Sequence, residues 1–181
     1  MIRRLIKEHA PSLNVPGGLD ADALLWAIYW CERYTKGNRV PRFERAYAPG
    51  GVYYITSALV RQEFAKWGAW AACSYSNFQI LYITAVELGY TSPPLALDRD
   101  ETALPFVVKY VNDRILAKGA QTPYDVADAY NSGSFTDDRN PMTYKRKFRR
   151  MYDKALREKQ CLESTNNDSG SSTVPSGSVE G

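Results

Sequence analysis

Apolar residues recur at helical spacing in several segments of the chain, and most of these segments carry start and stop signals. The segment 100–119 shows the stripe clearly, and Gly119 ends it; its apolar positions are Leu104, Val108, Val111 and Ile115. The segment 122–133 opens with a Thr-Pro pair, which suits a helix N-terminus, and closes on a glycine. These patterns predict helices over 19–35, 57–68, a segment that ends near Gly89, 100–119, 122–133 and 143–159.

Two segments break this pattern. KGNRVPRFERAYAPGGVYY, at 36–54, is irregular, and we expect a loop with a small hairpin there. CLESTNNDSGSSTVPSGSVEG, at 161–181, has few apolar residues, so it cannot bury enough surface to offset the entropy cost of ordering. The sequence therefore predicts a mainly α-helical domain over 1–160 and a disordered Ser/Gly-rich tail over 161–181.

Composition narrows the functional classes. The chain has 181 residues, 44% of them hydrophobic, which is enough for one core, and its net charge of +3 suits an acidic partner without requiring one. Its 13 tyrosines, with four tryptophans and six phenylalanines, can build a core or line a groove for sugars or bases. No apolar run approaches the roughly 20 residues of a membrane span. The basic start MIRRLIKEHAPS has too short an apolar stretch for a signal peptide.

The cysteines and the single histidine do not form a pattern typical of a metal site. Cys31, Cys73 and Cys161 contain no CxxC pair, and His9 lies far from them in sequence. We therefore expect no metal and no cofactor. We also expect no Ser-His or Cys-His catalytic dyad at a site that does not include His9. Cys31 and Cys73 are expected to pack as small core hydrophobes, with a disulfide between them open only in an oxidising compartment.

Glu32 is the first residue whose position indicates chemistry. On a helical wheel it falls between Leu25 and Ile28, on the apolar face. Burial there disfavours the ionised carboxylate and raises its pKa, and an acid that stays protonated near neutral pH can protonate a leaving group. The alternative is that Glu32 ends the helix and pairs with an arginine; the candidates are Arg33, Arg39 and Arg42.

Three motifs resemble those of the lytic transglycosylases and goose-type lysozymes, and they occur in that family's order. SYSNFQILYITA, at 74–85, resembles GLMQI-x-x-x-TA, with Gln79, Ile80, Thr84 and Ala85 in register. DVADAYNSGS, at 125–134, resembles A-x-A-Y-N-x-G. WAIYWCERYTKG, at 26–37, resembles the helix that ends in Glu-Ser and carries the family's catalytic acid.

The resemblance implies a lysozyme-like helical fold and cleavage of the β-1,4 bond between N-acetylmuramic acid and N-acetylglucosamine in peptidoglycan. Glu32 would act as acid and then as base, assisted by the substrate's N-acetyl group. Attack by the C6 hydroxyl would leave a 1,6-anhydro end, so no second carboxylate is required. The residues expected to bind substrate are Glu44, Tyr75, Gln79, Tyr130 and Asn131.

Two departures and one further likeness leave alternatives open. Arg33 stands where the family has serine, and Ser76 stands where it has glycine. RFERAYAPGG, at 42–51, resembles an FE-x-x-x-F segment of some phage muramidases, which makes Glu44 the candidate second acid of a hydrolytic muramidase. An ion pair with a neighbouring arginine is the alternative role for Glu44. A third alternative is an inactive structural or virion component that retains the fold.

The implied partner is the peptidoglycan glycan strand, joined by other virion proteins if a phage particle carries the protein. Wall chemistry without an expected signal peptide indicates a phage product, either virion-associated or released from the host cytoplasm. The basic segment 143–159 raises the alternative of a nucleic-acid partner. Its apolar positions recur at helical spacing, so we interpret its basic residues as a solvated face and expect no nucleic acid.

Overall fold

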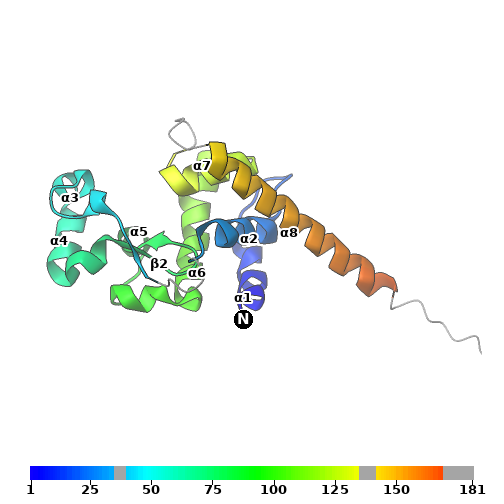
Figure 1. Ribbon diagram of the computed structural model, residues 1–181, viewed down its shortest axis with the longest axis horizontal. Helices are drawn as coiled ribbons and strands as arrows, with labels where there is room; N and C mark the ends of the chain where they lie inside the picture. The colour runs from blue at the N-terminus through cyan, green and yellow to red at the C-terminus, as the bar shows by residue number, and fades with distance from the viewer. Residues whose placement is uncertain (35–39, 135–141, 169–181) are drawn as a thin grey trace, which may run out of the picture.

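The fold is mainly helical and includes a small three-stranded sheet. It is seen in a computed structural model, which describes residues 1–34, 40–134 and 142–168. The α-helices are α1 (Ile2–His9), α2 (Ala21–Glu32), α3 (Val52–Thr56), α4 (Ala58–Trp67), α5 (Tyr82–Glu87), α6 (Asp100–Tyr110), α7 (Pro123–Ser132) and α8 (Met142–Asp168). A π-helical turn, Val111–Ile115, continues α6, and short 3-10 turns lie at Ala10–Ser12, Arg45–Tyr47, Gly68–Ala72, Pro94–Asp98 and Leu116–Lys118. In Figure 1, α3 and α4 lie at one end of the molecule and α1, α2 and α8 at the other, with α6 between them.

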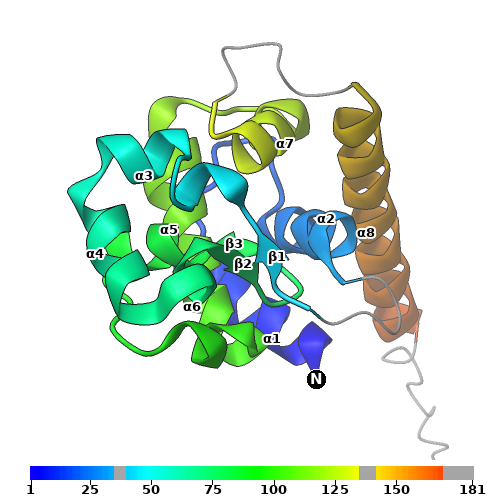
Figure 2. The ribbon, with the colours of Figure 1, turned by 60° about the vertical axis from the view of Figure 1, so that its left-hand side comes forward.

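The sheet contains β1 (Arg42–Phe43), β2 (Cys73–Tyr75) and β3 (Ile80–Leu81), in that order and antiparallel throughout. Arg42 pairs with Ser74, and Tyr75 pairs with Ile80. The hairpin joins β2 and β3. In the segment 36–54, the described residues 40–54 contain β1, the 3-10 turn Arg45–Tyr47 and the start of α3. The sequence missed this hairpin because β2 is buried along its whole length and shows no alternation of polar and apolar faces. In the view of Figure 2 the sheet lies beside the end of α2.

The predicted helices over 57–68 and 122–133 are confirmed with their ends, whereas the helix predicted over 19–35 ends at Glu32. The Asp20 carboxylate caps α2 by accepting a hydrogen bond from the Ala23 backbone N–H at 2.8 Å. Ser57 caps α4 in the same way, and Thr122 forms a capping box at the start of α7. Gly133 ends α7 in a left-handed conformation, with φ of 83°.

The C-terminal helix is longer than expected. α8 begins close to the predicted start and continues to Asp168, so the irregular tail expected from 161 does not begin there. A helix already formed adds each further residue at little cost, and this offsets the poor helix propensity of a short polar segment. Residues 169–181 lie outside the described part of the chain.

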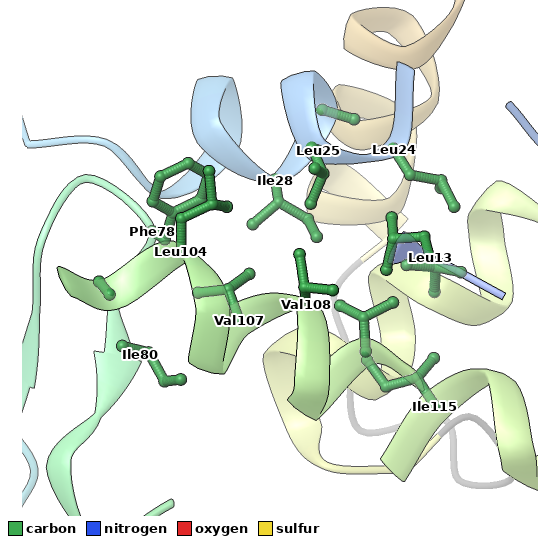
Figure 3. Packing of buried hydrophobic residues seen from close by; sticks show 14 of the residues in the cluster. Leu13, Leu24, Leu25, Ile28, Phe78, Ile80, Leu104, Val107, Val108 and Ile115 are labelled. Carbon is green, nitrogen blue, oxygen red and sulfur yellow. The ribbon is translucent and has the colours of Figure 1, made fainter. Parts of the chain in front are cut away.

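The core lies between α2 and α6 (Figure 3). Leu24, Leu25 and Ile28 of α2 are fully buried, and Figure 3 shows Ile28 toward Val107 and Val108 of α6 and Leu24 beside Leu13. The opposite side of α2 packs against α8, whose Phe148 is fully buried. α2 is therefore held on two sides, and both its ends are fixed relative to the rest of the domain.

The N-terminal helix α1 was not predicted. It is short, and it contributes Leu5 and Ile6 to the core against α6. Cys73 is buried and Cys31 is half-buried, both as free thiols that pack with the core. Among the described residues, no helix combines the length and the apolar content needed to cross a membrane.

The cap of α2 gives the first prediction. Asp20→Ala removes the acceptor for the Ala23 N–H and is expected to lower the free energy of unfolding by about 1 kcal/mol. Asp20→Asn keeps an acceptor oxygen but removes the ion pair with Lys159, which measures 2.6 Å and is largely exposed. In urea unfolding, we expect Asp20→Asn to lower the free energy of unfolding by less than half as much as Asp20→Ala does. Equal losses in the two variants would show that the ion pair, and not the cap, stabilises this end of α2.

Candidate active site

Glu32 is the last residue of α2, and its side chain is only 8% exposed. Its Oε1 accepts a hydrogen bond from the hydroxyl of Tyr144, in the first turn of α8. Its Oε2 lies 4.0 Å from Nη1 of Arg42, in β1. Three elements that are distant in sequence therefore meet at one carboxyl group, and Figure 2 shows the end of α2 between β1 and α8.

The surroundings of Glu32 favour its protonated form. Burial raises the pKa of the Glu32 carboxyl above its ordinary value, and the nearby Glu44 carboxylate acts in the same direction. The hydrogen bond from Tyr144 and the charges of Arg42 and Lys147 lower that pKa, but burial outweighs them. Burial likewise raises the pKa of Tyr144, and the Glu32 charge adds to that effect, so Tyr144 stays a hydrogen-bond donor. Burial therefore shifts the Glu32 carboxyl toward the protonated form that a general acid uses.

Glu44 follows β1 and faces the same arginine. Its Oε1 accepts hydrogen bonds from Nε of Arg42 at 2.5 Å and from the Ser74 hydroxyl at 3.2 Å. Its backbone N–H donates to the carbonyl of Ala72 at 2.8 Å, which fixes the chain beside β2. The Arg42 guanidinium therefore lies between the carboxylates of Glu32 and Glu44. The ion pair expected for Glu44 is confirmed, with Arg42 as the partner.

The other arginines considered as partners of Glu32 and Glu44 have different positions. The guanidinium of Arg33 stacks over the ring of Trp30, with its central carbon 4.1 Å from the ring centroid. Residue 39 lies outside the described residues. Arg42 is therefore the arginine that the structure places beside Glu32.

Tyr130 lies near the acid. Its hydroxyl donates to the backbone carbonyl of Phe78 at 2.8 Å, which ties α7 to the turn between β2 and β3. Burial raises the pKa of Tyr130, and the charge of Glu32 contributes to that rise. Tyr130 is therefore placed to support the turn next to the candidate site. It is already committed to a backbone partner, so in this conformation its hydroxyl is not free to donate to a substrate.

Gln79 and Ser76 close the turn between the strands. Both adopt left-handed backbone conformations, with φ of 51° and 63° respectively. Nε2 of Gln79 donates to the Ser76 carbonyl at 2.9 Å, and the Ser76 hydroxyl accepts from the Phe78 N–H at 3.1 Å. A left-handed φ is the backbone conformation that glycine adopts without strain, and here a serine occupies it. The serine compensates for the strain with its side-chain hydrogen bond.

One of the expected substrate-binding residues, Tyr75, lies in the core. The side chain of Tyr75 is fully buried, and its hydroxyl donates to the carbonyl of Trp70 at 2.7 Å. Its position in the core gives a substrate no access to the ring, so the structure does not support that role. Asn131 is exposed in the last turn of α7, just before Gly133.

Sequence reasoning missed Tyr144 and Lys147, which belong to α8. Tyr144 was counted only as part of the apolar stripe of that helix. Lys147 donates from Nζ to the carbonyl of Cys31 at 2.8 Å, at the end of α2. A tyrosine that begins an apolar stripe on a basic helix is the one signal that the sequence offers. It does not indicate which carboxylate the hydroxyl meets.

A cavity lies elsewhere in the described part of the chain. It measures about 600 Å³ and lies between α1, the start of α2 and the end of α8, where Lys7, Asp20, Trp26 and Lys159 are among its lining residues. Charges of both signs line it, and Asp20 is paired with Lys159. The Asp20 side chain is 24% exposed, three times the exposure of Glu32. We therefore place the candidate site at Glu32, where an acid is buried without a close ion pair.

Comparison with protein-family models, with curated proteins and with solved structures gives no match to this chain. Function is therefore inferred from the groups around Glu32 and from the sequence motifs. Within the described ranges, no three His, Cys, Asp or Glu side chains are grouped so that they could hold a metal ion.

The raised pKa of Glu32 predicts a pH-dependent stability difference. Its pKa is higher in the folded than in the unfolded protein, so this carboxyl favours folding at acid pH, and that contribution is lost as pH rises from the ordinary value of 4.5 upward. Glu32→Gln cannot ionise and therefore avoids this loss. Relative to the native protein, Glu32→Gln should gain stability in urea unfolding as pH rises above the ordinary carboxyl value of 4.5, and the gain should level off once the folded-state carboxyl is ionised. Glu8→Gln, at an exposed carboxylate, supplies the background effect of removing one surface charge. A Glu32→Gln difference that does not change with pH would contradict the burial argument.

Proposed function

We propose that this protein is a peptidoglycan lytic transglycosylase with a lysozyme-like helical fold, in which Glu32 is the single acid and base. The observation that carries the proposal is the burial of Glu32 at the end of α2, with its pKa raised. The same residue matches the catalytic acid in the motif resemblance. Two independent arguments, one from geometry and one from sequence, therefore select the same carboxyl group.

In the proposed reaction Glu32 first protonates the oxygen of the β-1,4 bond after N-acetylmuramic acid, and the bond from that oxygen to C1 breaks. The substrate's N-acetyl group stabilises the charge that develops at C1. The C6 hydroxyl then attacks C1 and gives its proton to the Glu32 carboxylate, which regenerates the acid. The product is a 1,6-anhydro end, and no water is consumed.

The neighbours of Glu32 suit its proposed roles as acid and then as base. Tyr144 donates to Oε1, which fixes the carboxyl plane and leaves Oε2 as the oxygen that carries the proton. Arg42, 4.0 Å from Oε2, stabilises the carboxylate that forms after proton transfer. Glu32 can therefore carry a proton before the reaction, and the Arg42 charge can stabilise the Glu32 carboxylate that forms during it.

Hydrolysis is the second candidate function, and the position of Glu44 favours it. Glu44 shares Arg42 with Glu32, so it lies at the same site and could orient an attacking water. However, one of its oxygens already accepts from both Arg42 and Ser74. Because transglycosylation needs no second carboxylate, we retain it as the main proposal, with action on the bacterial wall as a phage-borne or phage-released enzyme.

The first functional prediction concerns the acid. Glu32→Gln removes the proton donor and should reduce cleavage of purified peptidoglycan by at least the roughly 10²–10⁴-fold that general acid catalysis supplies. Turbidity clearance and muropeptide release measure the loss. Glu8→Gln, an exposed carboxylate on α1, is the matched control and should keep full activity. Undiminished clearance by a folded Glu32→Gln protein would exclude Glu32 as the acid, and no product from the native protein would favour the inactive virion component.

The second functional prediction separates the two reactions. Mass spectrometry of digested peptidoglycan should show anhydro-muropeptides as the main product, because the C6 hydroxyl replaces water. Glu44→Gln should then lower the rate only modestly, by less than about tenfold, since general acid–base groups in the reaction contribute more than that. Reducing-end muropeptides that disappear in Glu44→Gln would instead make the protein a muramidase.

A further inference from the structure

A group of cations lies on one face of α8 near its start. Thr143, Arg146, Lys147 and Arg150 line a hollow of about 330 Å³. They stand at positions i, i+3, i+4 and i+7 of the helix and therefore share one face. All four side chains belong to exposed residues. We call Arg146, Lys147 and Arg150 the α8 cation cluster.

The α8 cation cluster adjoins the candidate acid. Nζ of Lys147 donates to the carbonyl of Cys31, the residue before Glu32, at 2.8 Å. Tyr144, one helical turn before Lys147, holds the Glu32 carboxyl. The charges of Lys147 and Arg150 also act on the Cys31 thiol, whose pKa burial raises to about 12. The cluster and the acid are thus neighbouring parts of one surface.

Several other cations of α8 have carboxylate partners. Arg149 pairs with Asp153, Lys154 pairs with Glu158, and Lys159 pairs with Asp20. Among the described residues, neither Arg146 nor Arg150 has a carboxylate partner. Adjacent cations without a counter-charge repel one another, and an external anion relieves that repulsion. Arginine suits carboxylates in particular, because its planar fork can donate two parallel hydrogen bonds.

We propose that the α8 cation cluster binds the carboxylates of the peptide stem of peptidoglycan. This inference rests on the proposed function, because it takes the glycan strand as the substrate. The stem is attached to the N-acetylmuramic acid whose C1 bond is cleaved, so it leaves the strand close to Glu32. The α8 cation cluster lies on the helix that contacts both Cys31 and Glu32, so it offers the stem carboxylates a counter-charge beside the proposed acid.

A binding experiment tests this without relying on cleavage. Calorimetric titration with N-acetylmuramyl-pentapeptide and with N-acetylmuramic acid compares a ligand that carries the stem with one that lacks it. The native protein should bind the stem-bearing ligand about tenfold more tightly, as expected for charge-assisted hydrogen bonds. Arg146→Gln/Arg150→Gln should remove that preference. The control, Lys118→Gln/Arg157→Gln, also removes two exposed cations and should retain it; Arg157 lies two helical turns beyond Arg150.

The outcomes separate this proposal from the enzymatic one. If the native protein prefers the stem-bearing ligand and Arg146→Gln/Arg150→Gln loses this preference, the cluster binds the stem. This conclusion holds even if the native protein cleaves nothing. Two results would overturn the proposed role of the cluster in stem binding. One is cleavage by the native protein together with equal binding of the two ligands; the other is a stem preference that Arg146→Gln/Arg150→Gln leaves unchanged. Both leave the enzymatic proposal standing. Tighter cluster-dependent binding of a teichoic acid fragment or of an oligonucleotide also overturns it, because the site would then select phosphates.

Discussion

The rest of this structure depends on α2 being packed on two sides. Leu24, Leu25 and Ile28 are buried in the core, where Ile28 lies toward α6, while α8 covers the other side of the helix. A helix held in this way cannot rotate without exposing apolar surface on one side or creating cavities on the other. The direction of the residue one turn beyond Ile28 is therefore fixed by the core. That residue is Glu32, so an ionisable side chain is buried because of where the packing ends.

A buried acid is stabilised here by neighbours that differ in kind. The Tyr144 hydroxyl donates to one oxygen, whereas Arg42 stands 4.0 Å from the other and makes its close contact with Glu44. A close ion pair with Glu32 would hold the carboxylate ionised and remove its use as an acid. The Glu44 carboxylate holds Arg42 in its own close ion pair. Arg42 nevertheless stays near enough to Glu32 for its positive charge to stabilise the ionised Glu32 carboxylate. Glu44 therefore affects the acid even if it never contacts a substrate.

Sequence predicted the parts of this arrangement that local chemistry determines. Asp20 starts α2 and Gly133 ends α7 because capping and left-handed geometry involve residues a few positions apart. The wheel placed Glu32 on the apolar face for the same reason. The hydrogen bond from Tyr144 spans 112 residues, and β1 reaches β2 across α3 and α4. Nothing in the local pattern of either partner indicates such contacts, so the hairpin and the partner of the acid required the structure.

α8 links stability, the acid and the proposed stem site because one helix presents different faces to each. Phe148 packs against α2, Tyr144 holds the Glu32 carboxyl, and Lys147 turns toward solvent while bonding the end of α2. The Lys147 charge lowers the pKa of Glu32, against the effect of burial. An anion bound at the α8 cation cluster would neutralise part of that charge, and the pKa of Glu32 would rise further. On this proposal, binding the stem increases the fraction of enzyme in which Glu32 carries the proton that bond cleavage consumes.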